Sequence, residues 1–319
     1  MKAKVLVTGS SGFIGSALSN EFLTRGYEVI GASRTNTIES SKFSFYKIPG
    51  LSEYIDWKPL FEEVDVIIHT AARAHILNDR ATDPLSEFNK VNVDATIELA
   101  KQAISAKVKR FVFISSVGVS GSRTKGRPLD ENIAYEPVEA YAISKLLAEK
   151  KLTDVVRGTN TELVIIRPTL VYSHEAPGNF KNLLKLVSTK LPLPFGSTQN
   201  KRSFVFLDNL VDFIILAAKH PKAAGNSYLI SDGHDISTNA LISNLRLGMG
   251  VRKGLFPFAA ILMKGVLSVL GRRKMYSQLF EDLQVDISKA RVELAWTPIL
   301  GVEDALKLTG KRYIADKKR

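Results

Sequence analysis

Tyr141 and Lys145 are the pair of residues in this sequence with the clearest capacity for chemistry. They stand four positions apart in the run Tyr141-Ala142-Ile143-Ser144-Lys145, so a helix places the phenol and the ammonium on one face. A neighbouring cation favours the phenolate and lowers the pKa of a tyrosine from its ordinary value of about 10. A phenol tuned in this way can exchange a proton with a hydroxyl or carbonyl group near neutral pH. This spacing also arises by chance in many helices, so the pair needs supporting residues.

Ser116 is a candidate for that support. It follows residues 110–115, an apolar run that we predict to be a buried strand. Doubly wound sheets bind their ligands at the carboxyl ends of parallel strands. The hydroxyl of Ser116 could therefore hydrogen-bond the same substrate oxygen as Tyr141. The alternative is that Ser116 only caps the end of the strand.

Three glycines follow the first predicted strand and open the first predicted helix. Gly9, Gly12 and Gly15 have the spacing G-x-x-G-x-x-G. The first allows a tight turn, the second lets backbone N–H groups approach a pyrophosphate at the positive end of the helix, and the third lets the helix pack on the strand. Because strand, turn and helix occur in the required order, we predict a nucleotide-binding site here.

The end of the second predicted strand indicates which dinucleotide is bound. An acidic side chain there binds the adenosine ribose of NAD, whereas a nearby arginine can hold the 2′-phosphate of NADP. The run Gly31-Ala32-Ser33-Arg34 contains no acid. It favours NADP(H), with NAD(H) as the alternative if Arg34 is only a solvated loop residue.

The elements that position these residues alternate between strand-like and helix-like segments. Strands are expected at 4–8, 27–32, 64–69, 110–115 and 162–168, with helices at 13–25, 94–106 and 141–156. This alternation is typical of an α/β fold, a Rossmann-like doubly wound parallel sheet covered by helices on both faces. After about residue 170 loops, helices and short strands at 203–207 and 227–231 take over. We predict a dinucleotide-binding domain at 1–170 and a smaller mixed substrate lobe at 171–319, with some chain crossing back to the sheet.

Composition excludes several classes of protein. The chain has 319 residues, of which 45% are hydrophobic and 24% charged, so it is not largely disordered. It has no cysteine, which excludes disulfide scaffolds, thiolate zinc sites, iron–sulfur clusters and cysteine nucleophiles. The formal net charge of +12 favours an anionic partner, but no nucleic-acid-binding motif is present. None of the five histidines has the spacing of a metal ligand, so we predict no metal site.

The cellular location follows from the absence of a targeting pattern. No secretory signal is visible at the N-terminus, and we expect a cytoplasmic protein. An apolar stretch at 255–270 is shorter than the ~20 residues of a membrane-spanning helix. We predict a core helix there. Weak association with a membrane surface is the alternative, because Arg272, Arg273 and Lys274 follow directly.

With the glycine turn, the strand-end serine and the Tyr-x-x-x-Lys pair in this order, the chain resembles the extended short-chain dehydrogenase/reductase superfamily, the NAD-dependent epimerase/dehydratase family. Further matching segments are His69-Thr70-Ala71-Ala72, Asn92-Val93, Arg167-Pro168 and 286–291. The resemblance implies that Ser116, Tyr141 and Lys145 are catalytic. The cofactor contacts that it implies are Gly9, Ser11, Gly12, Phe13, Ile14, Gly15, Ser33, Arg34, Thr70, Ala71, Ala72, Asn92, Tyr141, Lys145 and Pro168.

A closer resemblance is to bacterial polysaccharide-gene reductases that convert UDP-4-keto-6-deoxy-N-acetylglucosamine into UDP-N-acetylquinovosamine. Segments 69–78, 191–212 and 284–291 carry it. It implies that NAD(P)H reduces the C4 keto group of a UDP-4-keto-6-deoxy-N-acetylhexosamine for surface polysaccharide synthesis. The alternative is a 4-epimerase of UDP-glucose or UDP-N-acetylglucosamine with tightly bound NAD. A cofactor-sensing module without activity is a third possibility, and the intact Ser116, Tyr141 and Lys145 argue against it.

The same resemblance implies where the UDP part of the substrate binds. Asn179 and Arg202 match the residues that hold UDP in relatives, and a guanidinium can donate two parallel hydrogen bonds to a diphosphate. The alternative for Arg202 is a solvated loop charge. Dehydratases of the superfamily carry Thr-Asp-Glu where this chain has Ser116-Val117-Gly118, so we set dehydration aside. We also expect a homodimer.

Overall fold

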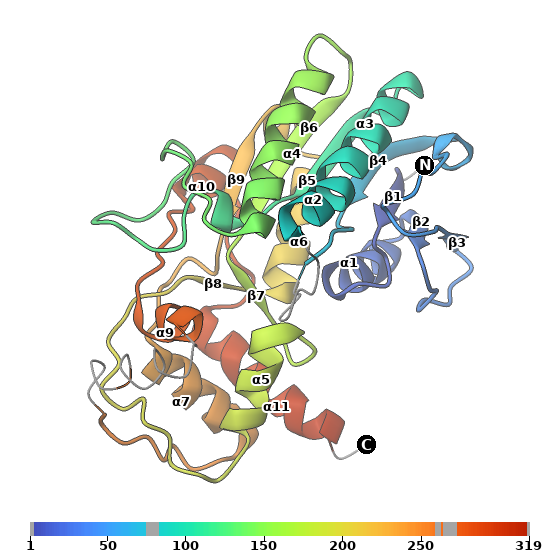
Figure 1. The fold of residues 1–319 in the computed structure, drawn as a ribbon. Coiled ribbons are helices and arrows are strands. Elements are labelled where there is room, and N and C mark those ends of the chain that lie inside the picture. The colour runs from blue at the N-terminus through green and yellow to red at the C-terminus, as the bar shows by residue number, and fades with distance from the viewer. Residues whose placement is uncertain (1–2, 75–82, 259–262, 264–272, 318–319) are drawn as a thin grey trace.

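The computed structural model describes residues 3–74, 83–258, 263 and 273–317 of the chain (Figure 1). Most of the stretch 255–270, where we predict a core helix, lies outside the described residues, and so does Arg272 after it. The end of the matching segment 69–78 also falls outside them. In the part of the chain that is described, no helix is long and apolar enough to cross a membrane.

A seven-stranded parallel sheet forms the centre of the structure, with the strand order β3-β2-β1-β4-β5-β6-β9. The order reverses between β1 and β4, and sheets of this kind bind ligands beyond the carboxyl ends of the strands at such a point. The predicted Rossmann-like α/β fold is confirmed. The strands are β1 (Lys4–Thr8), β2 (Glu28–Ser33), β3 (Phe43–Lys47), β4 (Val64–His69), β5 (Arg110–Ile114), β6 (Glu162–Pro168) and β9 (Ser227–Ile230).

Each face of the sheet has its own apolar core, because successive side chains of a strand point to opposite faces. Val5 and Val7 of β1 pack with side chains of α1 (Phe13–Thr24), α6 (Leu207–Ala217) and α10 (Ser288–Leu294). Leu6, between them in the chain, packs with side chains of α3 (Ala95–Ser105) and α4 (Ala140–Val156) on the other face. Helix α4, which carries the catalytic candidates Tyr141 and Lys145, is thus fixed to the sheet through the apolar core on this second face.

A third core belongs to the chain after residue 170, and its helices lie together at one side of the sheet (Figure 1). It is built on β7 (Leu170–Tyr172) paired with β8 (Phe204–Phe206), and on α5 (Gly178–Val187), α7 (Thr238–Met249) and α11 (Val302–Lys317). Phe13, at the start of α1, packs against both this core and the first one. The remaining elements are η1 (Lys58–Leu60), α2 (Pro84–Asn89), the π-helix η2 (Lys90–Asp94), η3 (Val117–Val119), η4 (Pro221–Ala223) and α9 (Arg273–Phe280).

The chain returns to the sheet after residue 170. Strand β9 pairs with β6, and α6 and α10 pack on the sheet beside it. The division at residue 170 into a dinucleotide-binding domain and a substrate lobe remains our proposal, with these elements as the part that crosses back.

Candidate active site

The turn between β1 and α1 is shaped by its glycines. Gly9 has a φ of +71°, and its N–H donates to the Ala32 carbonyl at 2.7 Å. A Cβ on Gly15 would lie 2.1 Å from the Gly9 carbonyl oxygen, so a larger residue cannot fit there without moving the turn. Gly12 is the exposed N-cap of α1, and no side chain caps this helix end. The first N–H groups of α1 are therefore open to an anionic group, which fits the pyrophosphate of a dinucleotide.

The segment after β4 lies against this turn. A Cβ on Gly9 would be 2.9 Å from Ala71 Cα, and the Thr70 hydroxyl donates to the Thr8 carbonyl at 2.6 Å. Asn92, on η2, receives a hydrogen bond from the Arg73 N–H at 2.8 Å and donates to the Ser144 hydroxyl at 3.0 Å. Asn92 thus joins the segment after β4 to α4, the helix that carries Tyr141 and Lys145. Its predicted contact with the cofactor, like those of Thr70 and Ala71, stays a prediction.

The end of β2 lies beside the glycine turn as well. The Ser10 hydroxyl donates to the Ser33 hydroxyl at 3.2 Å, and Ser33 in turn donates to the Thr35 carbonyl at 2.7 Å. Arg34, which lies between Ser33 and Thr35 in the chain, is exposed. Its side chain is therefore accessible to a cofactor phosphate, while the choice between NADP and NAD stays a prediction.

Ser116, Tyr141 and Lys145 gather beyond the carboxyl end of β5. The Lys145 ammonium donates to the Ile114 carbonyl at 2.8 Å, and its Nζ lies 6.0 Å from the centre of the Tyr141 ring. Ser116 is the N-cap of η3, where its oxygen accepts the Gly118 N–H at 3.1 Å. This cap uses an acceptor position of the hydroxyl and leaves its O–H free to donate. Capping and a role in the site are therefore compatible.

The short helix η3 that Ser116 begins is packed on α4. A Cβ on Gly118 would lie 3.2 Å from Ala142 Cβ and 3.4 Å from the Ser116 oxygen. This contact brings Ser116 to the part of α4 that carries Tyr141. A larger residue at position 118 would require Ala142 to move by a few tenths of an ångström.

Burial sets the acid–base properties of the pair. Desolvation raises the pKa of Tyr141 to about 12. Desolvation also lowers the pKa of Lys145 to about 7, against an opposing effect of the Glu149 carboxylate. The predicted lowering of the tyrosine pKa by Lys145 is therefore wrong. The reason is that burial disfavours the phenolate, while the ammonium is bonded to the Ile114 carbonyl.

His69, at the end of β4, is a buried structural residue. Its Nδ1 lies 2.7 Å from the Thr8 hydroxyl oxygen and its Nε2 lies 2.9 Å from that of Thr96. Burial first, and the Lys145 charge second, lower the pKa of His69 to about 3, so the ring is neutral. Within residues 3–74, 83–258, 263 and 273–317, no three histidines, aspartates or glutamates gather as a metal site would require.

The two residues predicted to hold UDP both contact α9. Asn179, in the first turn of α5, donates to the Gln278 side chain at 3.0 Å. Arg202 donates from Nη1 to the carbonyls of Ser277 and Glu281, at 3.2 and 2.9 Å. Its side chain is buried and its pKa is lowered to about 10 by desolvation, so Arg202 is not the solvated loop charge of the alternative interpretation. Their contact with a diphosphate remains a proposal.

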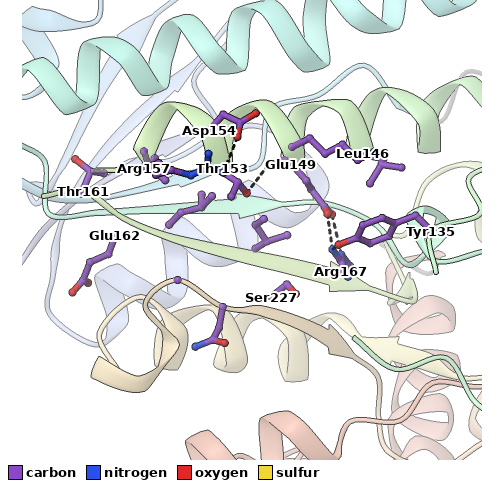
Figure 2. A pocket seen from close by; sticks show the side chains of 16 residues that line it. Tyr135, Leu146, Glu149, Thr153, Asp154, Arg157, Thr161, Glu162, Arg167 and Ser227 are labelled. Atoms are coloured by element: carbon purple, nitrogen blue, oxygen red, sulfur yellow. Dashed lines mark hydrogen bonds and ion pairs between the residues drawn. The ribbon is translucent and has the colours of Figure 1, made fainter. Parts of the chain in front are cut away.

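A pocket of about 590 Å³ opens between α4, β6 and the start of β9 (Figure 2). Its lining includes Tyr135, Glu149 and Arg167, and none of its residues belongs to the glycine turn or to the catalytic candidates. Sequence reasoning did not single out Glu149 or assign a role to Arg167. Two features of the sequence could have indicated them. Glu149 follows Lys145 by four positions, and Arg167 is a charged residue within the apolar strand β6.

Comparison with known proteins identifies the family. The NAD dependent epimerase/dehydratase family matches residues 5–231. A UDP-glucose 4-epimerase of Vibrio cholerae is 35% identical over 321 residues, which cover 100% of this chain and 98% of that protein. The chain belongs to the NAD-dependent epimerase/dehydratase family. The predicted family membership is thus confirmed, and the protein is an enzyme of this family.

Solved structures of two 4-epimerases have a similar fold. A UDP-glucuronic acid 4-epimerase of Bacillus cereus, in complex with NAD, has a TM-score of 0.78 at 23% identity and covers 99% of this chain and 100% of its own. A UDP-glucose 4-epimerase of Thermotoga maritima, with UDP-glucose, has a TM-score of 0.75 at 22% identity with the same coverage. The narrower resemblance to UDP-4-keto sugar reductases remains a prediction.

Proposed function

We propose that this epimerase/dehydratase-family enzyme interconverts UDP-sugars that differ in configuration at C4, using an NAD that stays bound throughout the cycle. The observation that carries the proposal is the full-length similarity, at 35% identity, to a protein named UDP-glucose 4-epimerase. The site is compatible with it. An uncapped helix end at Gly12 suits the cofactor pyrophosphate, and Ser116, Tyr141 and Lys145 gather beyond the same edge of the sheet.

The reaction divides between the cofactor and three side chains. NAD, when bound, supplies the acceptor for the hydride from C4 of the sugar and the source for its return. Tyr141 takes the proton of the C4 hydroxyl and gives it back to the other epimer. Ser116 donates a hydrogen bond to the same oxygen, and the charge of Lys145 stabilises the phenolate form of Tyr141 that accepts this proton. No net oxidation results, because both hydride and proton return to the sugar.

A second candidate is the predicted ketoreductase. The observation that favours it is the end of β2, where Arg34 is exposed and no acid is present to select NAD. In this case bound NADPH would supply the hydride for the C4 keto group of a UDP-4-keto-6-deoxy-N-acetylhexosamine, and Tyr141 would protonate the alkoxide at C4. The same side chains serve both reactions. The two differ in the cofactor, because an epimerase keeps its NAD bound and a reductase consumes one NADPH in each turnover. A role in polysaccharide synthesis, a homodimer and a cytoplasmic location also remain predictions.

The cofactor that co-purifies with the enzyme tests this choice. We expect protein purified without added cofactor to release close to one equivalent of NAD on denaturation, because a redox-neutral cycle needs no exchange of the dinucleotide. Chromatography of the released nucleotide gives its identity and amount. An empty protein that binds NADPH more tightly than NADH would contradict the epimerase proposal and support the reductase.

Replacing Arg202 tests the proposed UDP site. Arg202→Ala should raise KM for the UDP-sugar roughly 10-fold or more, since ~1.4 kcal/mol corresponds to one decade, and leave NAD affinity nearly unchanged. Titration with UDP by calorimetry measures the effect directly. The control is Lys201→Ala, which removes the same charge from an exposed neighbour. Unchanged UDP affinity in a folded Arg202→Ala protein would show that Arg202 serves only to hold α9.

A further inference from the structure

A buried ion pair lies directly behind the catalytic lysine. Glu149 follows Lys145 by one helical turn on α4, and Arg167 reaches it from β6. Lys145, Glu149 and Arg167 are exposed by only 1%, 3% and 2%. Buried charges are costly unless they are paired and hydrogen-bonded, so three of them together call for an explanation.

The Glu149 carboxylate is held from several directions. Arg167 donates to it from Nε at 3.0 Å and from Nη2 at 2.6 Å, a two-pronged contact with both oxygens (Figure 2). Ser115, the neighbour of Ser116, donates its hydroxyl to Glu149 Oε1. Arg167 is positioned in turn by Tyr135, whose hydroxyl oxygen accepts from Nη2 at 3.0 Å and whose ring lies 5.0 Å from the guanidinium carbon. The carboxylate therefore has a fixed place between β5, β6 and α4.

The surroundings of Lys145 show what this carboxylate does. From β5 the ammonium meets the Ile114 carbonyl, at 2.8 Å, and the Phe113 ring, whose centre is 4.4 Å from Nζ. On β4 the neutral His69 is near enough for the Lys145 charge to lower its pKa, and on α4 the Tyr141 ring centre is 6.0 Å from Nζ. Glu149 contributes the negative charge, and this charge raises the pKa of Lys145 against the effect of burial.

We propose that Glu149 is a positioning residue of the active site, whose carboxylate, fixed by Arg167 and Ser115, keeps the Lys145 ammonium charged and in place beside Tyr141. The inference rests on the proposed function in one respect: it takes Lys145 as the residue whose positive charge stabilises the Tyr141 phenolate. The competing interpretation is a structural ion pair that joins α4 to β6 and has no effect on Lys145.

Two variants break the same pair with opposite consequences for the lysine. Glu149→Gln keeps the shape of the side chain but removes the negative charge, leaving Lys145 with the positive Arg167 behind it. Arg167→Gln removes the positive charge and leaves the carboxylate to Lys145 alone. A structural pair predicts the same loss of stability in both variants and no change in the titration of Lys145. The proposal predicts different titrations.

The lysine titration can be followed by NMR of protein carrying ¹³C at the lysine Cε, with Lys145→Arg for assignment. Wild-type Lys145 should titrate with a pKa of about 7. In Glu149→Gln we expect the pKa to fall by roughly 1–3 units, the range for losing a nearby opposite charge. In Arg167→Gln it should rise, because a positive charge is removed while Ser115 still holds the carboxylate. An unchanged pKa in Glu149→Gln, or an equal fall in both variants, would overturn the proposal.

The titration needs no substrate, so failure of the proposed reaction leaves this test intact. Where turnover is measured, a second readout applies. A lower lysine pKa means that the ammonium is lost at lower pH, so the alkaline limb of the kcat/KM profile should move to lower pH in Glu149→Gln and not in Arg167→Gln. Glu149→Asp, which retains the charge, should move it less than Glu149→Gln does. If Glu149→Gln does not fold, Arg167→Gln decides alone: a rise of the lysine pKa supports the proposal, and an unchanged or lower pKa overturns it.

Discussion

Replacing Tyr141 by phenylalanine is expected to lower kcat by roughly 10²–10⁴-fold, the usual contribution of a positioned acid–base group. Only the hydroxyl is removed, and the ring keeps its edge contact with Phe88, 6.1 Å between ring centres. NAD affinity should therefore remain close to that of the wild type. Steady-state kinetics with a UDP-sugar and a fluorescence titration with NAD measure the two quantities separately.

A matched control for the Tyr141 variant is Tyr54→Phe, which removes the same hydroxyl from a side chain that is 73% exposed. It should leave both quantities unchanged. If Tyr141→Phe retains nearly wild-type kcat, Tyr141 is not the acid–base group, and the proposed chemistry fails for both the epimerase and the reductase.

Gly15→Ala should weaken NAD binding and destabilise the glycine turn. The added Cβ would lie 2.1 Å from the Gly9 carbonyl oxygen and 2.8 Å from the Thr70 hydroxyl. Relieving such overlap in a packed site costs about 1–3 kcal/mol, and the backbone that moves is the part predicted to face the pyrophosphate. We expect a lower Tm and a Kd for NAD raised about 10–100-fold.

The control for this variant is Gly301→Ala, because a Cβ there would meet no atom within 4 Å. It should bind NAD like the wild type. Normal NAD affinity in Gly15→Ala would place the dinucleotide somewhere other than this turn.

Much of the sheet could be predicted from local pattern. Strands β1, β4 and β6 lie where the apolar runs indicated, because strands buried on both faces read as continuous apolar segments. Strand β3 was not among the expected strands. It stands at the edge of the sheet, and Ser44, Tyr46 and Lys47 are exposed, so its sequence has no such run. Strand β9 was expected in the second lobe, but it pairs with β6, about 60 residues earlier, and no local signal gives that partner.

The sequence likewise predicts only part of the candidate site. A motif with fixed spacing, such as Tyr141 with Lys145, identifies residues that lie on the same helix. The sequence does not show how deeply these residues are buried, and for that reason the predicted direction of the pKa shift of Tyr141 is wrong. Glu149 and Arg167 lie on different elements, and their pairing depends on how α4 packs on the sheet. The charge of each was visible in the sequence, but their contact was not.

The most direct test of the proposed function uses UDP-glucose carrying deuterium at C4, incubated with the purified enzyme without added cofactor, with UDP-N-acetylglucosamine in parallel. Proton and deuterium NMR follow the sugar. A redox-neutral cycle at Tyr141 returns the same hydride to the same carbon, so we expect the C4 epimer to form with the deuterium still at C4. The contradicting result is that neither sugar changes, while UDP-4-keto-6-deoxy-N-acetylglucosamine is reduced once NADPH is supplied.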